Sequence, residues 1–262
     1  MTNAIILAAG FGSRLSPLTD NKPKSLIEFG GKTLLERNVE LLKNQEIDDI
    51  TIITGYKKEK IKLVDVNYVE NKNFENNSTL ASLFYAEEKI QSSTIITYSD
   101  IIFEEKILKS LVAMKNNITA VIDAKWRNYW KLRIDETISN ATETAVFNTQ
   151  KTITSIGQKN SEANGHFIGL MKLENNGSEK FKELFLKTKN ESIGSKNNLN
   201  EELPFEKLRI VDLLQGLIKI NYPLHALLVD NGWLEFDTIN DYNLYSKMLN
   251  DETLQKLIKL NY

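Results

Sequence analysis

Leu7-Ala8-Ala9-Gly10-Phe11-Gly12-Ser13-Arg14-Leu15 continues directly from the apolar, β-rich run Ala4–Leu7. Glycines after a strand let the backbone turn sharply and bring its N–H groups against a polyphosphate, where a side chain would obstruct. Arg14, and Lys24 shortly after it, supply positive charge suited to a triphosphate and a leaving pyrophosphate. A glycine pair after a strand also fits a plain tight turn, so this stretch alone leaves both interpretations open.

Two common phosphate-binding motifs do not fit this stretch. The dinucleotide fingerprint needs a third glycine and an acidic residue about 20 positions further on. Here Gly10-x-Gly12 leads to Leu15 instead. The P-loop of ATPases needs Gly-Lys-Ser/Thr after its glycines, and that tripeptide does not follow here.

Short β-rich runs alternate with amphipathic stretches along the first half of the chain. The runs predict strands at Ala4–Leu7, Ile50–Thr54, Val66–Glu70, Thr94–Tyr98 and Thr119–Asp123. The amphipathic stretches predict helices at Thr33–Asn44, Ser78–Ile90 and Glu104–Met114. This alternation is typical of an α/β fold with a mostly parallel sheet covered on both faces, which binds ligands at the carboxyl ends of its strands.

The pattern changes after residue 123. Antiparallel strands laid against the first sheet are expected at Thr144–Asn148, Ile153–Gly157 and His166–Leu173. Further elements are expected at Ser178–Lys189, Leu208–Ile220, Leu224–Val229 and Thr238–Leu249, and a mobile loop at Asn190–Asn200. We therefore expect a single domain over residues 1–262, with a nucleotide-binding half at 1–123 and an acceptor-binding half at 124–262 that share one sheet.

Composition excludes several classes of protein. The formal net charge of −2 gives no overall field for nucleic acid. The chain has no cysteine and two histidines, so any metal is expected to be a hard ion on carboxylates. No apolar run reaches membrane length and the N-terminal run lacks a basic region before it, which predicts a cytoplasmic protein without membrane contact.

Together with Pro23-Lys24 and Gly31-Lys32-Thr33-Leu34, the opening stretch closely resembles the sugar-nucleotide pyrophosphorylase superfamily. The resemblance implies a Rossmann-like three-layer fold with an antiparallel acceptor-binding subregion, and a nucleoside triphosphate bound on the glycine-rich loop. It implies catalytic contacts to phosphates from Arg14 and Lys24. The loop residues that it assigns to the nucleotide are Leu7, Ala8, Ala9, Gly10, Gly12, Ser13 and Arg14.

Two aspartates are each expected to end a buried strand, Asp100 after Thr94–Ser99 and Asp237 in Trp233-Leu234-Glu235-Phe236-Asp237-Thr238. Carboxylates at strand ends can hold Mg²⁺ against phosphate oxygens. For an arbitrary aspartate a plain capping role is the better interpretation, but the resemblance matches both residues to the superfamily's metal ligands. Glycosyltransferases of related fold usually carry Asp-x-Asp here, whereas Asp100 is followed by Ile101-Ile102.

The segment Asn71–Leu83 resembles the N-x-x-[FY]…N-x-x-S-L pattern of cytidylyltransferases that act on choline phosphate, aminoethylphosphonate and related compounds. Ser78, Thr79 and Ser82 would open a helix whose first turn faces the base. Ser78 could equally be only a helix N-cap. In that branch asparagine often stands at the position of Thr79, which puts the base-reading assignment in doubt.

The segment Asp123–Arg133 contains two tryptophans, a tyrosine and four cations. Aromatic faces can bind an ammonium group and Lys or Arg can bind phosphate, so this segment predicts an acceptor site. An amphipathic helix anchored by its tryptophans is the alternative. The candidate acceptor-binding residues are Asp123, Lys125, Trp126, Trp130, Arg133 and Glu235; His166 is expected to be structural.

The resemblance as a whole implies an enzyme that transfers CMP from CTP to a small amino-phosphate or phosphonate, of the phosphoglutamine, aminoethylphosphonate or phosphocholine type. Pyrophosphate is released, and the product would serve surface-glycan or capsule modification. The acceptor's own oxygen can attack the α-phosphorus, so no side-chain nucleophile is required. A sugar-1-phosphate nucleotidyltransferase and a non-catalytic nucleotide-binding regulator remain alternatives, and a homodimer stays open.

Overall fold

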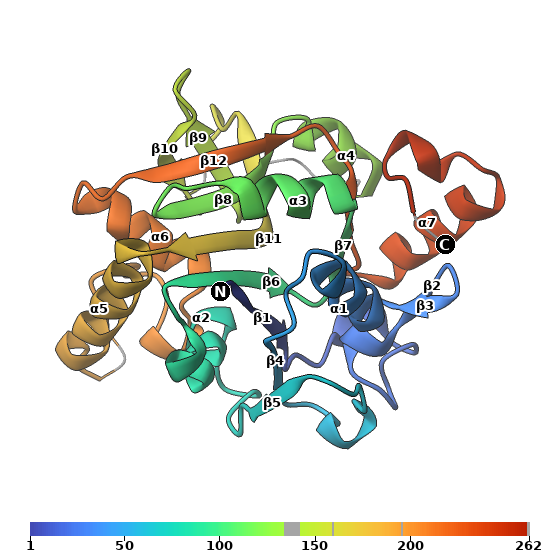
Figure 1. The fold of residues 1–262 in the computed structure, drawn as a ribbon, viewed down its shortest axis with the longest axis horizontal. Helices are drawn as coiled ribbons and strands as arrows, with labels where there is room; N and C mark the ends of the chain where they lie inside the picture. The colour runs from blue at the N-terminus through green and yellow to red at the C-terminus, as the bar shows by residue number, and fades with distance from the viewer. Residues whose placement is uncertain (134–141, 159, 195, 261–262) are drawn as a thin grey trace.

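A computed structural model describes residues 1–133, 142–158, 160–194 and 196–260. Its centre is a nine-stranded sheet in the order β5-β4-β1-β6-β11-β8-β12-β10-β9 (Figure 1). The strands of this sheet are β1 (Asn3–Ala8), β4 (Ile50–Thr54), β5 (Asn67–Glu70), β6 (Ser93–Tyr98), β8 (Ile118–Asp123), β9 (Thr144–Phe147), β10 (Thr152–Ile156), β11 (Gly165–Glu174) and β12 (Leu224–Val229).

The first half of the chain forms a parallel group of strands, and the second half adds antiparallel strands except for β12, which is parallel to β8. Strands β5, β4, β1 and β6 are parallel neighbours, as the alternation of strands and helices predicts. Strand β11 lies antiparallel between β6 and β8, and β10 and β9 continue the sheet in antiparallel pairings. The antiparallel strands therefore extend the first sheet edge to edge, and one sheet runs through both halves.

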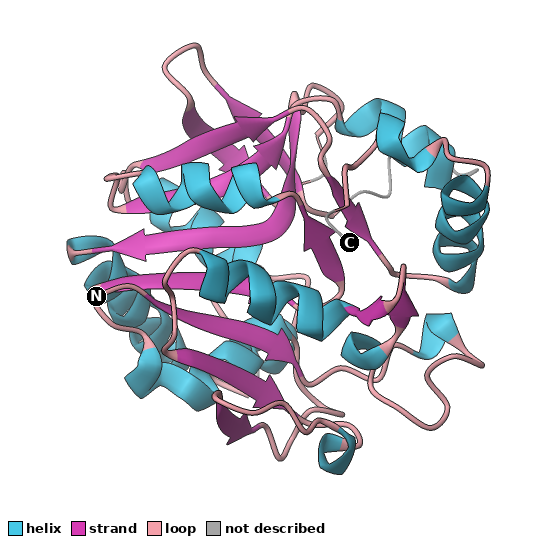
Figure 2. Ribbon diagram, turned by 45° about the vertical axis from the view of Figure 1, so that its right-hand side comes forward, coloured by secondary structure: helices cyan, strands magenta, loops and turns pink. Residues whose placement is uncertain are grey.

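Helices cover both faces of the sheet (Figure 2). Alternate residues of β1 enter opposite cores, with Ala4 and Ile6 packed on one side and Ile5 and Leu7 on the other. This three-layer arrangement confirms the predicted α/β fold. The helices are α1 (Leu34–Asn44), α2 (Thr79–Leu83), α3 (Glu105–Ala113), α4 (Trp126–Arg133), α5 (Asn176–Glu191), α6 (Ile210–Lys219) and α7 (Ile239–Asn250).

Two short antiparallel pairs stand outside the large sheet; of their four strands, only the one before Asp237 was expected from the sequence. Strand β7 (Ile101–Phe103) pairs with β13 (Trp233–Glu235), and β2 (Glu28–Phe29) pairs with β3 (Lys32–Thr33). Strands of two or three residues are too short to show a periodicity of two. The β7–β13 pair is important because it places a segment from the second half of the sequence beside a segment from the first half.

Two other expected elements differ from the structure. The helix expected at Ser78–Ile90 is interrupted: α2 ends at Leu83, and a 3₁₀ segment with non-helical backbone at Ala86 follows. Helix α5 continues to Glu191, inside the loop expected at Asn190–Asn200; position 195 of that loop lies outside the described residues.

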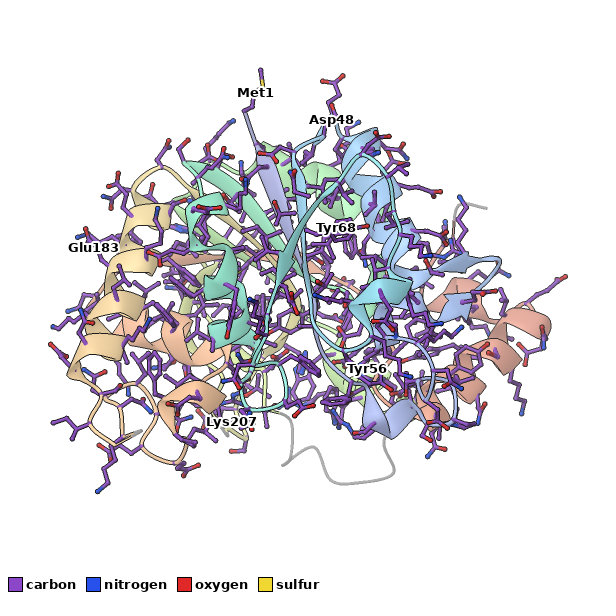
Figure 3. The ribbon with its side chains drawn as sticks, turned by 90° about the horizontal axis from the view of Figure 1, so that it is seen from below. Met1, Asp48, Tyr56, Tyr68, Glu183 and Lys207 are labelled. Carbon is purple, nitrogen blue, oxygen red and sulfur yellow. The ribbon has the colours of Figure 1, made fainter. Side chains whose placement is uncertain are left out.

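The parallel strands all point toward one edge of the molecule. Figure 3 shows Met1 and Asp48 at the edge where β1 and β4 begin, and Tyr56 at the opposite edge, beyond the end of β4. In the part of the chain that the structure describes, no helix is both long and apolar enough to span a membrane.

Candidate active site

A cavity of about 600 Å³ lies at the carboxyl ends of the parallel strands. Leu7 of β1 and Tyr98 of β6 line it, together with residues of both sequence halves. Its position agrees with the general rule for open α/β sheets, and its volume lies within the usual range of ligand sites. We therefore take this cavity as the candidate active site.

The glycine-rich loop forms one wall of the cavity. Gly12 has a left-handed backbone (φ 68°), and a Cβ atom there would lie 2.8 Å from Cβ of Lys24. The glycine is therefore required both by the turn and by the side chain packed against it. Of the predicted nucleotide-binding loop residues, Leu7, Ala9, Gly10 and Arg14 line the cavity; Ala8 is buried in the core, and Gly12 and Ser13 support the turn.

Asp100, Asp237 and Lys24 meet at the centre of the cavity. Asp100 lies between β6 and β7, and Asp237 comes two residues after β13. The ammonium of Lys24 donates to Oδ2 of Asp100 at 2.7 Å and to Oδ1 of Asp237 at 3.2 Å. Arg14 donates to the same oxygen of Asp237 at 2.7 Å. The two carboxylates thus converge on one cation, although they are far apart in the sequence.

The charges of this cluster shift its proton equilibria. Burial by itself lowers the pKa of Lys24, but Asp100 and Asp237 outweigh it, and the net pKa is raised. Burial alone would raise the pKa of Asp237, yet Lys24 and Arg14 outweigh it and hold that pKa below its usual value. Lys24 and Asp237 are therefore both charged at neutral pH.

One oxygen of the cluster lacks a partner. Oδ1 of Asp100 is buried and receives no hydrogen bond. A buried carboxylate oxygen without a donor is costly, and a bound cation is the kind of partner that removes this cost. Among the described residues, no three or more His, Cys, Asp or Glu side chains could hold a metal alone. In many proteins Mg²⁺ is bound by one or two carboxylates, together with waters and substrate phosphates.

Ser78, Thr79 and Ser82 line the cavity from the start of α2. Ser78 is the N-cap residue of α2, as one of the two interpretations expected, but its side chain makes no cap hydrogen bond to the helix. Asn71 and Asn77 also line the cavity, and their amides hydrogen-bond to each other in both directions at 2.9 and 3.1 Å. The sequence analysis gave these two asparagines no role, although its quoted motif contains them.

The segment Asp123–Arg133 divides between cavity and core. Trp130, Arg133 and, from β13, Glu235 line the cavity. Trp126 is 1% exposed and packs against Ala163 and Trp130, as the alternative interpretation of the segment expected for a core anchor.

Asp123 and Lys125 do not line the cavity either. Asp123 is fully buried and accepts from the indole Nε1 of Trp233 at 2.8 Å, which holds β13 against the end of β8. The side chain of Lys125 is exposed. Spacing in the sequence put these residues close to the site but could not tell which side chains face it.

Glu143 and His166 line the same end of the cavity. The hydroxyl of Tyr98 donates to Oε1 of Glu143 at 3.2 Å. Burial, reinforced by Glu235, raises the pKa of Glu143 to about 8. Burial, reinforced by Arg133, lowers the pKa of His166 to about 3, so this histidine is neutral. A lone glutamate in a polar segment gives no signal in the sequence, because the shift of its pKa comes from residues that only the fold brings around it.

Residues 4–152 match the family described as the MobA-like NTP transferase domain, which is more than half of the chain. The chain belongs to this family. Among curated relatives, the CTP:phosphoglutamine cytidylyltransferase of Campylobacter jejuni is 28% identical to this chain, over 91% of this chain and 97% of that protein. This chain is 37% identical to the choline-phosphate cytidylyltransferase of Streptococcus pneumoniae, over 41% of its length; the match spans about half of that relative.

Solved structures agree on the fold. The CTP:phosphocholine cytidylyltransferase of Streptococcus pneumoniae (LicC) superposes with a TM-score of 0.74 at 22% identity, covering 95% of this transferase and 99% of that chain. The inositol-1-phosphate CTP transferase of T. maritima gives a TM-score of 0.70 at 19% identity, over 99% and 98% of the two chains. At these identities the likeness concerns the fold.

The raised pKa of Glu143 predicts a pH-dependent stability in buffer without divalent cations. The unfolded chain loses this proton near pH 4.5 and the folded chain near pH 8, so the stabilisation present below pH 4.5 is lost as pH rises to 8. Glu143→Gln should therefore gain stability over the wild type between pH 5 and pH 8, by on the order of 2 kcal/mol. Thermal melts across this range, with the exposed Glu59→Gln as control, measure it; parallel curves for Glu143→Gln and the wild type would contradict it.

Proposed function

We propose that the protein is a cytidylyltransferase, which transfers CMP from CTP to a small acceptor that carries a phosphate or phosphonate and an amine, with release of pyrophosphate. The observation that carries the proposal is the convergence of Lys24, Asp100 and Asp237 in a cavity lined by the glycine-rich loop. Membership of an NTP transferase family and the cytidylyltransferase relatives support the same reaction.

We propose Mg²⁺ as the cofactor, held by Asp100 and Asp237. The fit rests on the unpartnered Oδ1 of Asp100 and on the convergence of both carboxylates on one ammonium group. When bound, Mg²⁺ would supply Lewis-acid stabilisation of charge on the phosphate oxygens. Carboxylates with substrate phosphates are its usual ligands in such sites.

The chain's own residues supply positioning and positive charge. Arg14, which is 69% exposed at the cavity edge, can follow the outer phosphates and the leaving pyrophosphate. The more buried Lys24 is placed to steady the transferring phosphoryl group. Gly10 offers its backbone without side-chain obstruction. With these groups fixed around the phosphates, an acceptor oxygen can attack in line without any protein nucleophile.

The acceptor end favours a cation over a neutral sugar. Glu143 is the carboxylate there that no arginine or lysine of the described residues pairs by an ion pair, whereas Glu235 is held by Arg133. Trp130 also lines the cavity, and an indole ring can stabilise a positive charge, as this one does for the Arg133 guanidinium 5.3 Å from its centroid. An ammonium group on the acceptor would complement both residues, because a positive charge beside Glu143 favours loss of the proton that burial retains there up to about pH 8.

The proposal has two wider consequences. A cytidylyltransferase of this kind works in the cytoplasm, where CTP is made. Its CMP-activated product would serve as the donor for a transferase that decorates a surface glycan or capsule.

The direct test measures pyrophosphate release with each of the four nucleoside triphosphates against a panel of acceptors. The panel holds phosphocholine, 2-aminoethylphosphonate, phosphoglutamine and glucose 1-phosphate. CTP with an amine-bearing acceptor should exceed every other pair by roughly tenfold or more in kcat/KM, about 1.4 kcal/mol. Preferred turnover of glucose 1-phosphate with UTP or dTTP would establish the sugar-1-phosphate alternative, and no release with any pair would favour a non-catalytic regulator.

Trp130→Ala tests the acceptor end separately. Loss of a cation–π contact should cost roughly 0.5–2 kcal/mol, an increase of about two- to thirtyfold in the acceptor KM. The KM for CTP should stay within about twofold, because the base and phosphate ends are not touched. Lys125→Ala is the matched control, since this neighbouring cation is exposed and outside the cavity lining. Equal effects on both substrates, or a larger effect in Lys125→Ala, would contradict the assignment.

A further inference from the structure

Arg133 is buried beside the cavity and is held by carboxylates. Its side chain is 1% exposed at the end of α4. It donates from Nη1 to Oε2 of Glu235 at 2.5 Å, from Nε to Oδ1 of Asp241 at 3.0 Å and from Nη2 to Oδ2 of Asp241 at 3.2 Å. These bonds use three of the five N–H donors of the guanidinium, one on each nitrogen. The orientation of the guanidinium is therefore fixed by carboxylates of the protein.

Asp241 connects Arg133 with the backbone of Asp237, the proposed metal ligand. It lies in the first turn of α7 and is 2% exposed. Its Oδ2 accepts from the backbone N–H of Asp237 at 3.1 Å and from the backbone N–H of Thr238 at 2.8 Å. The hydroxyl of Thr238 completes a capping box with Asp241. The backbone on both sides of the Asp237 carboxylate is thus tied to the carboxylate that Arg133 grips.

Helix α4 holds β13 by a second route. The backbone N–H of Glu235 donates to the hydroxyl of Tyr129 at 2.8 Å, and the hydroxyl of Tyr245 donates to the carbonyl of Glu235 at 3.2 Å. The two hydroxyls lie 2.6 Å apart. Because Arg133 also binds the Glu235 side chain, α4 contacts both the backbone and the side chain of Glu235, two residues before Asp237.

We propose that Arg133 is a positioning residue, which acts through Asp241 and Glu235 to orient the Asp237 carboxylate toward the metal. The proposal rests on the proposed function, since it takes Asp237 as a metal ligand. Partners of this kind commonly affect metal affinity by 10-fold or more, because they fix the orientation of the ligand. The acceptor is not part of this chain of contacts.

The test compares metal binding with acceptor kinetics in Arg133→Lys. Mn²⁺ binding is followed by electron paramagnetic resonance in the presence of α,β-methylene-CTP, which requires no turnover. Arg133→Lys keeps the charge but loses the fork that grips Asp241, so its Kd for Mn²⁺ should rise roughly 10-fold. At saturating metal, the acceptor KM should stay within about twofold.

Two further variants sharpen the test. Asp241→Asn should raise the Kd for Mn²⁺ in the same way. The Kd of the double variant should not exceed that of the single variant with the higher Kd, because both residues act in one chain of contacts. Arg127→Lys, on the same helix but bonded to the carbonyls of Ser161 and Ala163, should leave Mn²⁺ binding unchanged.

The outcomes separate this proposal from the proposed function. A raised acceptor KM with unchanged Mn²⁺ affinity in Arg133→Lys would overturn the positioning role and make Arg133 an acceptor ligand. An unchanged acceptor KM together with an unchanged Kd for Mn²⁺ in Arg133→Lys would overturn the positioning role as well. A wild-type protein that binds CTP but no Mn²⁺ would overturn both proposals, since Asp237 would then hold no metal.

Discussion

The ammonium group of Lys24, held between Asp100 and Asp237, is the contact on which the arrangement of the site depends. The three residues come from separate parts of the chain: the loop after β1, the end of β6 and the end of β13. The β7–β13 pair brings the last two together, since Phe236 donates its backbone N–H to the carbonyl of Asp100 at 2.9 Å. In a partly buried cavity two carboxylates this close need a cation between them. The fold brings the two carboxylates together, and the cation that they then require is also the charge that a phosphate substrate needs.

The same electrostatic requirement explains the second group of charges. Glu235 and Asp241 lie close to Asp237 and would repel it if they were left unpaired. Arg133 forms ion pairs with both, and α4 places it there by packing Trp126 and Tyr129 into the core. Glu143 stays outside these ion pairs, and burial raises its pKa to about 8. A cationic group bound beside Glu143 would favour the loss of the carboxyl proton, so the proposed acceptor ammonium and the glutamate would stabilise each other.

The sequence predicted the regular fold well where periodicity extends over several residues. Strands β4 and β12 begin and end as expected, and α1 begins after Thr33, which caps it. The two-residue and three-residue strands gave no such signal. Asp100 and Asp237 were paired only through a family resemblance, because nothing local connects residues so far apart. The segment Asp123–Arg133 shows the limit: its composition indicated a special role, but the partners of Asp123 and Arg133 lie more than 100 residues away.

The central claim is that Asp100 and Asp237 together hold the metal on which nucleotidyl transfer depends. The measurement that tests it most directly is the anomalous diffraction of Mn²⁺ in crystals grown with α,β-methylene-CTP. The account predicts one Mn²⁺ peak bound by oxygens of both carboxylates and of the α-phosphate, at about 2.1 Å, the range for small hard cations. A peak elsewhere, with Lys24 still joined to both carboxylates and the nucleotide bound, would contradict the account.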